Sequence, residues 1–311
     1  MLISVVTPVY NGAPFLRAAL SSILAQDIEF ELIISDDGST DDTVETIESI
    51  DDKRLRFFKN RSNAGIFGNL NRCIERARGS YIQVFCQDDL MKNGYLAAQL
   101  EMLRKHPDAG LVYGNPEYIN EFTGVVTTSL EDRTPEVVNR NLYVWIASHY
   151  GALPASLSSI MFPRRTIETI GLFNAAFRVA GDLEFYHRVA ERFPIVRDAR
   201  IFHSVRSHSK MASVHSKTGG YYLREELALD AWSRALWSGE DYRKLQYFRS
   251  AVRGNYHLSW IMRAAMRGEL MLALKSLAQL NQIYPLNWVL WWRIARAFGK
   301  IPAPLLPAPP R

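Results

Sequence analysis

The sequence has little cysteine and no long apolar run. Its 311 residues include only Cys73 and Cys86, so a disulfide framework is not expected and a reducing compartment is favoured. It contains no stretch of about 18 uninterrupted apolar residues, which predicts that no helix spans a membrane. The first residues hold neither a basic region nor a signal-cleavage site. These absences predict a cytoplasmic protein, with peripheral contact to the inner face of the plasma membrane as the open alternative.

Several nucleotide and metal signatures are also missing. No G-x-G-x-x-G occurs, which disfavours an NAD-dependent dehydrogenase. Asn11-Gly12, after the first predicted strand, is not the glycine-rich loop with Lys or Arg that enzymes forming nucleotide sugars usually need. His203 and His208 have no third ligand at zinc-like spacing. Nucleic-acid binding is disfavoured as well, because no motif of that class is present.

Charge is unevenly distributed along the chain. The whole sequence has 37 Lys and Arg against 32 Asp and Glu, a net charge of +5. Residues 221–311 hold 13 Lys and Arg and 6 Asp and Glu, a net charge of +7, so the first 220 residues carry −2 by difference. The same C-terminal region contains six of the seven tryptophans, namely Trp232, Trp237, Trp260, Trp288, Trp291 and Trp292. We therefore expect the two parts of the chain to have different functions.

Apolar periodicity predicts alternating strands and helices over the first 115 residues. Strands are expected at 2–6, 30–35, 55–58, 81–86 and 111–113. Helices are expected at 13–25, 43–50, 69–77 and 96–105. This alternation predicts an α/β fold in which a mainly parallel sheet is covered by helices on both faces.

The alternation of predicted strands and helices becomes less regular after residue 115. The polar segment 124–141 is expected to form a loop, and 158–162 and 195–205 to form further strands. A helix is predicted at 183–192, and the chain is expected to be helical from Leu223 onward. The proline-rich tail after residue 301 is expected to be extended or disordered.

Polar clusters follow three of the predicted strands. They are Thr7 to Gly12, Asp36 to Asp41, and Gln87 to Asp89. In a parallel sheet the carboxyl ends of the strands share one edge, which is where ligands bind in open α/β folds. We therefore expect the three clusters to converge on one site.

Asp88 and Asp89 have the chemistry of an incomplete site for a hard cation. Adjacent carboxylates would repel a diphosphate unless a divalent cation stood between them, and two carboxylates leave positions for diphosphate oxygens and water. Such a cation would stabilise negative charge on a departing diphosphate. The alternative is that both aspartates are solvated turn residues.

The Asp36–Asp41 run suits a capped turn before a helix. Capping accounts for one or two carboxylates, and the run contains three, so Asp36 and Asp37 are candidates to hydrogen-bond a nucleobase or ribose. Thr7, Pro8 and Tyr10 are candidates for the wall of the nucleotide site, with Tyr10 supplying an aromatic face.

These motifs resemble glycosyltransferase family 2, a group of inverting transferases with the GT-A-type (Rossmann-like) fold. Its patterns match Thr-Pro-Val-Tyr-Asn-Gly, the Asp36–Asp41 run, Asn63-x-Gly65 with Asn71, Ala77 and Gly79, and Gln87-Asp88-Asp89. The resemblance is strong over about residues 3–115. It implies that Asp88 lies near the ribose and that Asp89 is the principal ligand of Mn²⁺ or Mg²⁺. Gln87 stands where the family usually has Asp.

A second block, Gly171-Leu172-Phe173 followed by Gly181-Asp182-Leu183-Glu184, resembles the family's later segment. There an Asp before a helix is the catalytic base, which identifies Asp182 here, with Glu184 in reserve. The family usually has Glu in the position of Gly181. A carboxylate must take the proton of the acceptor hydroxyl in an inverting transfer. The alternative is that Asp182 caps the following helix.

Basic residues follow the last predicted strand, where the family often has cations over the diphosphate. Arg206, His208 and Lys210 are the candidates. A cation there would assist departure of the leaving group. The alternative is a solvated loop.

The resemblance divides the chain by expected role. Residues 1–115 would bind the nucleotide sugar, and residues 116–220 would form the acceptor side with the catalytic base. Residues 221–300 would form a helical region, followed by the proline-rich tail 301–311. Three interpretations of the helical region stay open: packing on the catalytic domain, peripheral membrane contact through its basic, tryptophan-rich helices, and an oligomer interface.

The expected reaction is transfer of a sugar from a nucleotide-diphosphate sugar, a UDP-sugar by family frequency, to an acceptor hydroxyl with inversion. The expected acceptor is a glycan or lipid-linked glycan of lipopolysaccharide, capsule or exopolysaccharide. One alternative is a polyprenyl-phosphate glycosyltransferase, and the other is a non-catalytic module that binds sugar nucleotides.

Overall fold

A computed structural model describes residues 2–128, 134–150, 153–154, 156–209, 211, 216–237 and 239–297. The chain forms two compact units, one of residues 1–140 and 154–208, the other of residues 141–153 and 209–311. The predicted boundary at residue 115 falls inside a strand of the first unit, and residues 141–153 group with the C-terminal helices. The proline-rich tail and Lys210 lie outside the described residues.

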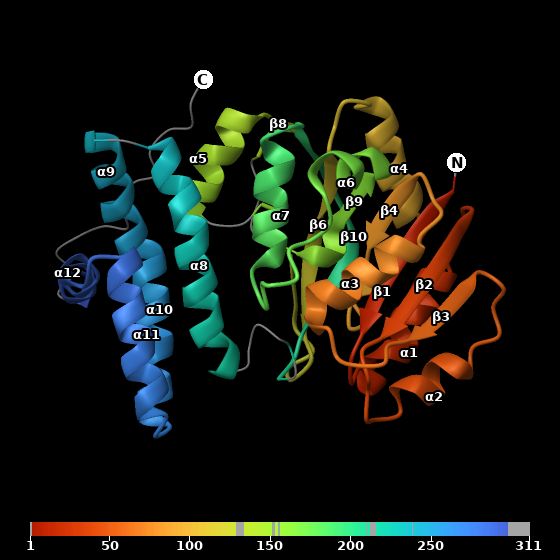
Figure 1. Cartoon of the computed structure of the whole chain (residues 1–311), viewed down its shortest axis with the longest axis horizontal. Coiled ribbons are helices and arrows are strands. Elements are labelled where there is room, and N and C mark those ends of the chain that lie inside the picture. Colours follow the sequence, from red (N-terminus) through yellow and green to blue (C-terminus); the bar gives the residue numbers. More distant parts are fainter. Residues whose placement is uncertain are drawn as a thin grey trace. The chain divides into compact units, whose positions relative to one another are not determined.

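The first unit is built on a mixed sheet (Figure 1). The strands run in the order β3-β2-β1-β4-β9-β6-β10-β5, with β7 paired to β6 and β8 to β10. Their bounds are β1 Ile3–Val9, β2 Phe30–Asp36, β3 Leu55–Lys59, β4 Tyr81–Val84, β5 Leu90–Met91, β6 Leu111–Asn120, β7 Val126–Thr128, β8 Val137–Val138, β9 Ile160–Pro163 and β10 Ile195–Ser207. The strands β3, β2, β1 and β4 are parallel, whereas β9 is antiparallel to both of its neighbours.

Helices cover both faces of this sheet, which confirms the predicted α/β fold. They are α1 Ala13–Leu24, α2 Thr43–Glu48, α3 Gly65–Arg76, α4 Tyr95–Lys105, α6 Arg164–Ile170 and α7 Gly181–Ala190. Apolar side chains at helical spacing point inward, as in α1, whose Leu16, Leu20 and Ile23 are fully buried. They pack with β1 and β2 residues in the core of the unit.

Strand β1 continues three residues past its predicted end at Val6, so Thr7 and Pro8 belong to the strand rather than to a turn. The N–H of Phe85 donates to the carbonyl of Val6. Because backbone directions alternate along a strand, the nitrogen of Pro8 also faces β4, whose pairing with β1 ends at Val84. The missing N–H of proline therefore removes no ladder hydrogen bond, and the strand tolerates it.

His203 is a fully buried histidine in β10. Neither ring nitrogen has a hydrogen-bond partner within the described part of the chain, and the ring packs on Tyr95 at 5.4 Å between centroids. Burial lowers the pKa of His203 to about 4, and Lys92 acts in the same direction, against the opposing charge of Glu117. The folded chain therefore holds this ring neutral.

We expect His203 to make stability fall with acid. Its pKa is about 4 in the folded chain and 6.5 ordinarily. The stability it contributes is therefore complete above pH 6.5 and is lost as the pH falls toward 4, by at most about 3 kcal/mol. Urea unfolding at pH 7.5, 5.5 and 4.5 should show a smaller decline for His203→Phe than for the wild type. Parallel pH profiles would contradict this assignment.

The second unit is helical, as predicted for the C-terminal region. Its elements are α5 Arg140–Tyr150, α8 Ser216–Leu236, α9 Gly239–Arg249, the π-helical turn η2 Ser250–Gly254, α10 Asn255–Met266, α11 Leu270–Ile283 and α12 Leu286–Ala297. Leu223, Leu258, Leu280 and Val289 bring α8, α10, α11 and α12 into one core. None of the helices within the described residues combines the length and the apolarity that crossing a bilayer requires.

Candidate active site

The loop after β4 carries the two aspartates that the sequence identifies as a cation site, and the end of β10 lies against it. The backbone N–H of Arg206 donates to Oδ1 of Asp89 at 3.1 Å. The Arg206 guanidinium donates to the carbonyl oxygens of Asp88 and Phe15, and Nε2 of His208 lies 3.0 Å from Oδ2 of Asp88. His208 also stacks on the Phe15 ring with centroids 4.1 Å apart. Two of the three basic candidates, Arg206 and His208, thus lie against the predicted aspartates, and Lys210 lies outside the described residues.

Asp89 is nearly buried, at 4% exposure. Its Oδ2 accepts a hydrogen bond from the hydroxyl of Ser158, which lies in a short 3₁₀ turn, η1 Leu157–Ser159. The Ser158 oxygen in turn accepts from the N–H of Cys86 at 2.9 Å. Burial and the neighbouring charge of Asp88 raise the pKa of Asp89 to about 7. Ser158 was not predicted, because nothing in its local sequence marks it and it lies 69 residues from Asp89.

The donor atoms at this loop suit a hard divalent cation. Oxygen atoms of Asp88 and Asp89 and the sulfur of Cys86 all lie within 4.8 Å of one another. Burial and the charges of Asp89, Asp88 and Asp182 raise the pKa of Cys86 well above its usual range, so the sulfur stays a neutral thiol. The ligands available are therefore carboxylate oxygens, which Mg²⁺ and Mn²⁺ prefer. A cation would also offset the two adjacent negative charges.

Asp182 lies in the first turn of α7, and its Oδ1 accepts the N–H of Leu183 at 2.9 Å. Its charge is the smallest of the contributions that raise the pKa of Cys86. The helix begins two residues earlier than predicted, and Ala180 rather than Asp182 is its N-cap. Asp182 therefore belongs to a different element from the aspartate pair and stays the predicted base.

The presence of a glycine immediately before Asp182 has a steric explanation. A Cβ added at Gly181 would lie 2.7 Å from ring atoms of Phe67 in α3. The Glu that the family usually has at this position would not fit against that ring without a shift. Phe67 also stacks near Phe173, with centroids 5.9 Å apart. This contact packs α3 against the start of α7. It therefore helps to set the position of the first turn of α7, which carries Asp182.

Glu184, the reserve base, is held by an arginine. Its carboxylate pairs with Arg188 one turn later at 2.8 Å, and Arg188 also donates to the carbonyls of Ile170 and Leu172. Glu184 thus anchors the turn between α6 and α7. Glu184 therefore has a structural role in the fold, and Asp182 stays the first candidate for the base.

Asp36 and Asp37 are buried and fold the loops at the end of β2. Asp36 accepts the N–H groups of Gly38 and Ser39 at 3.1 Å, as in a capped turn. Asp37 accepts the N–H groups of Ala64 and Gly65, each at 2.9 Å, at the start of α3. A carboxylate at a helix N-terminus is favoured by the helix dipole. Both aspartates therefore stabilise the backbone around the end of β2. Their predicted hydrogen bonds to a nucleobase or ribose stay a prediction.

Gln87 holds the loop that carries Tyr10 through two hydrogen bonds, which we call the Gln87 clamp. Its Oε1 accepts the N–H of Tyr10 at 2.9 Å, and its Nε2 donates to the carbonyl of Tyr10 at 3.1 Å. A carboxylate could accept the first bond but could not donate the second. The Tyr10 side chain is 47% exposed, whereas Thr7 in β1 is fully buried. The glutamine that departs from the family pattern thus positions the predicted aromatic wall.

The Gln87 clamp requires a glycine at residue 12, because a Cβ there would lie 2.4 Å from Oε1 of Gln87. We expect Gly12→Ala and Gln87→Ala each to cost about 1–2 kcal/mol of stability, since each loses the two bonds to Tyr10. The double variant should cost no more than either single one, because the same bonds are lost only once. Urea unfolding of the four proteins measures this coupling. Additive costs would show that the two residues act separately.

Comparison with known proteins finds a family match over nearly half of the chain. Residues 4–154 match the model of the family described as glycosyl transferase family 2. An uncharacterized glycosyltransferase of Rickettsia felis is 29% identical over 216 residues, covering 68% of this chain and 35% of that protein. The chain thus spans about a third of the length of this relative. The Escherichia coli protein named UDP-Glc:alpha-D-GlcNAc-diphosphoundecaprenol beta-1,3-glucosyltransferase WfgD is 32% identical over 120 residues, 38% of this chain and 47% of its own length.

Solved structures share the fold. The crystal structure of S. aureus TarS 1-349 in complex with UDP-GlcNAc has a TM-score of 0.66 at 17% identity, covering 96% of this chain and 89% of that one. The mannosyltransferase PcManGT from Pyrobaculum calidifontis, in complex with GDP-Man and Mn²⁺, has a TM-score of 0.57 at 18% identity, covering 96% and 86%. The fold is therefore the GT-A type. The family match over residues 4–154 confirms the resemblance to glycosyltransferase family 2 drawn from the motifs.

Proposed function

We propose that this protein is an inverting glycosyltransferase that transfers a sugar from a UDP-sugar to a hydroxyl of a lipid-linked glycan during surface polysaccharide synthesis. The observation that carries the proposal is that Asp88 and Asp89 lie together after β4, with Arg206 and His208 against them. The charge of Asp182, from a separate helix, acts on Cys86 beside them. The carboxyl end of β4 belongs to the edge of an α/β sheet at which ligands bind.

The proposed roles follow from the surroundings of each side chain. Asp182 would accept the proton of the acceptor hydroxyl as its oxygen attacks the anomeric carbon. Arg206 and His208, which surround Asp88, would place positive charge beside the departing diphosphate. Asp89, with Asp88 beside it, would hold the divalent cation. A bound Mg²⁺ or Mn²⁺ would supply electrostatic stabilisation of the leaving group.

The relatives support the donor and acceptor classes. TarS was crystallised with UDP-GlcNAc and PcManGT with GDP-Man and Mn²⁺, so proteins of this fold hold nucleotide sugars. The name of WfgD describes a sugar linked to a polyprenyl diphosphate as acceptor. A lipid-diphosphate-linked sugar is therefore the first acceptor to test, and a polyprenyl phosphate, which carries no sugar, is the second.

The test is release of UDP from a panel of UDP-sugars with Mn²⁺, with each acceptor and without any. We expect release to require Mn²⁺ and to rise when the sugar-linked lipid is added. NMR of the product should show the anomeric configuration opposite to that of the donor. Retained configuration would overturn the inverting mechanism. Faster release with polyprenyl phosphate alone would favour the polyprenyl-phosphate alternative, and donor binding without any turnover would favour a binding module.

A further inference from the structure

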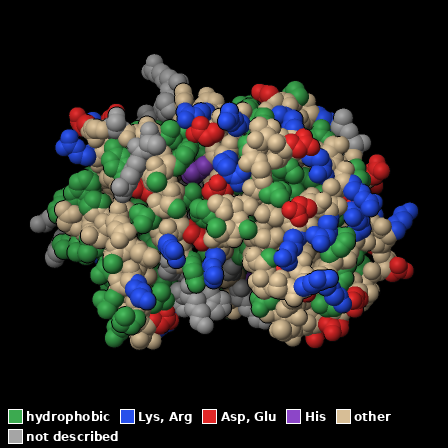
Figure 2. Space-filling view, viewed as in Figure 1, with side chains coloured by type: hydrophobic (Ala, Val, Ile, Leu, Met, Phe, Trp, Pro, Cys, Tyr) green, Lys and Arg blue, Asp and Glu red, His purple; other side chains and the backbone are tan. Residues whose placement is uncertain are grey.

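The turn between α10 and α11 exposes a cluster of large apolar side chains. Met262, Met266, Leu270, Met271 and Leu274 are between 44% and 76% exposed. We call these five residues the α10–α11 tip. Hydrophobic side chains gather at this end of the two helices in Figure 2. Contiguous apolar surface of this kind marks an interaction site rather than ordinary surface composition.

The tip is a built feature and not a frayed helix end. The N–H of Glu269 donates to the carbonyl of Ala264 at 3.0 Å, and Gly268 takes the left-handed conformation with a φ of 83°. The opposite faces of the two helices are already used, because Ile261 and Ala273 lie in the core of the unit. The exposed side chains are therefore an additional apolar face, held in place by a packed hairpin.

Positive charge flanks the apolar side chains. Between residues 262 and 275 the chain carries Arg263, Arg267 and Lys275 against one acid, Glu269. Glu269 lies 3.6 Å from Arg267 in an exposed pair. Arg263 and Lys275 have no ion pair among the residues that the structure describes. The tip thus combines apolar side chains with unneutralised cations, which is the composition of elements that bind anionic membrane surfaces.

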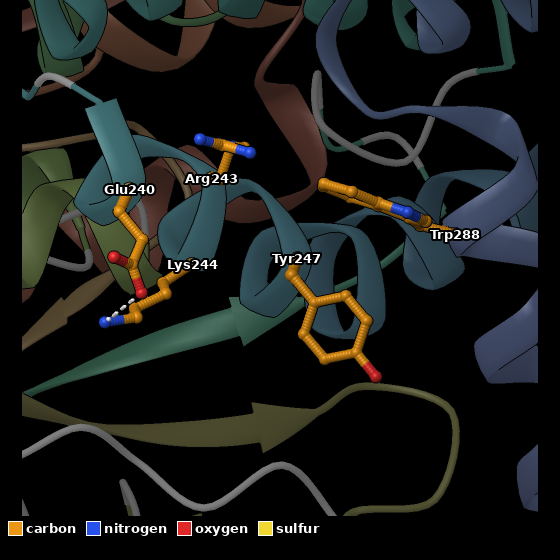
Figure 3. Close-up of a pocket in the computed structure, with 5 residues that line it drawn as sticks. All are labelled: Glu240, Arg243, Lys244, Tyr247 and Trp288. Carbon is orange, nitrogen blue, oxygen red and sulfur yellow. Dashed lines mark ion pairs between the residues drawn. The ribbon is translucent and has the colours of Figure 1, made fainter.

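Of the tryptophans that suggested membrane contact from the sequence, Trp292 is buried and Trp288 is half-buried, whereas Trp291 is 48% exposed. Trp288 and Trp292 lie against Tyr247 with ring centroids 5.7 and 5.2 Å apart. Figure 3 shows Trp288 of α12 lining a hollow together with Tyr247, Arg243 and the Glu240–Lys244 ion pair of α9. These aromatic rings join two helices. The tip exposes methionine and leucine side chains, and a second exposed apolar face lies on α12 at Leu290, Trp291 and Ile294.

We propose that the α10–α11 tip inserts its methionine and leucine side chains into the interface of a bilayer that contains anionic phospholipid. Arg263 and Lys275 would lie among the headgroups, with their alkyl stems along the apolar surface. A two-fold contact between copies would bring these cations against their own equivalents, with Glu269 as the single acid, which disfavours self-association. The proposal does not depend on the transfer reaction, although it would bring the enzyme to a lipid-linked acceptor.

The experiment is sedimentation of the full chain with vesicles of phosphatidylcholine, with and without phosphatidylglycerol. We expect binding that requires phosphatidylglycerol and weakens with salt. Met266→Glu with Leu270→Glu should lower the partition coefficient at least roughly tenfold, because both side chains would enter the interface. The matched control, Leu290→Glu with Ile294→Glu on the exposed face of α12, should bind as the wild type does. Thermal unfolding of each variant verifies folding.

Three outcomes would overturn the proposal. The wild type fails to sediment with either kind of vesicle, the tip variant binds as well as the wild type, or the α12 control loses binding while the tip variant keeps it. Light scattering without vesicles tests the competing occupant. If the wild type is a dimer and the tip variant is a monomer, the surface serves self-association instead.

Discussion

Asp89→Asn is expected to reduce UDP release by at least about 10²-fold, because it removes a ligand from the cation that stabilises the leaving group. The isosteric amide preserves volume at a nearly buried position, so the thermal midpoint should change little beside the loss of activity. The measurement is UDP release against Mn²⁺ concentration for both proteins. We expect the residual activity of the variant to depend only weakly on Mn²⁺.

A matched control lies at the opposite end of the sheet. Asp52 precedes β3 and pairs with Arg54, away from the carboxyl ends of the strands. Asp52→Asn should leave both turnover and Mn²⁺ dependence unchanged. If Asp89→Asn kept the wild-type Mn²⁺ response, the cation would have to be held by other residues.

Asp182→Asn is expected to abolish transfer while leaving donor affinity intact. A positioned general base contributes about 10²–10⁴-fold to rate, and asparagine cannot accept the proton. UDP-sugar binding with Mn²⁺, followed by thermal shift, should match that of the wild type, since ligand binding to the native state raises its stability. Transfer to the acceptor should fall by at least about 10²-fold.

Glu184→Gln separates the two candidate bases. Glu184 pairs with Arg188, which holds the turn after α6, so this substitution should lower stability while turnover of the folded enzyme persists. The opposite pattern, with transfer lost in Glu184→Gln and kept in Asp182→Asn, would make Glu184 the base.

Local patterns predicted most of the first half of the fold. Segments such as Phe30–Asp36 and Ala13–Leu24 combine apolar periodicity with strong turn residues, so their bounds lie within a residue or two of those predicted. The antiparallel insertion of β9 between β4 and β6 was not predicted. Strand order is set by contacts distant in sequence, which periodicity does not encode. The short strands β5, β7 and β8 carry too few residues for a pattern.

In the candidate site, too, local sequence patterns identified some residues, whereas contacts between distant segments were not predicted. Asp88 and Asp89 were candidates because two adjacent carboxylates follow a buried strand, and Asp182 because its segment resembles a block of the family. Ser158 was not, because a serine in a 3₁₀ turn has no signature of its own. Asn71 and the Phe173 segment were recognised as separate motifs, yet Asn71 bonds both the N–H and the carbonyl of Phe173, at 3.0 and 2.7 Å. Their partnership across 102 residues appears only in the fold.

The sequence left the role of the C-terminal region open for a physical reason. Tryptophan and arginine counts indicated where apolar and cationic side chains are plentiful, but they do not indicate which face of each helix is buried. The packing of Trp288 and Trp292 on Tyr247 takes those rings out of consideration as a membrane surface. Exposure of Met266 and Leu270 follows from the turn that ends α10, which composition does not describe.

The central claim is that carboxylates from distant stretches of the chain surround one nucleotide diphosphate and one cation. The most direct measurement is a crystal structure of the protein with UDP and Mn²⁺. We predict that Mn²⁺ is bound by Asp89 and the diphosphate, that Asp88 lies beside the ribose, and that the Asp182 carboxylate faces the open side of the β-phosphate. Density for UDP and Mn²⁺ at a location remote from Asp89 and Asp182 would contradict the account.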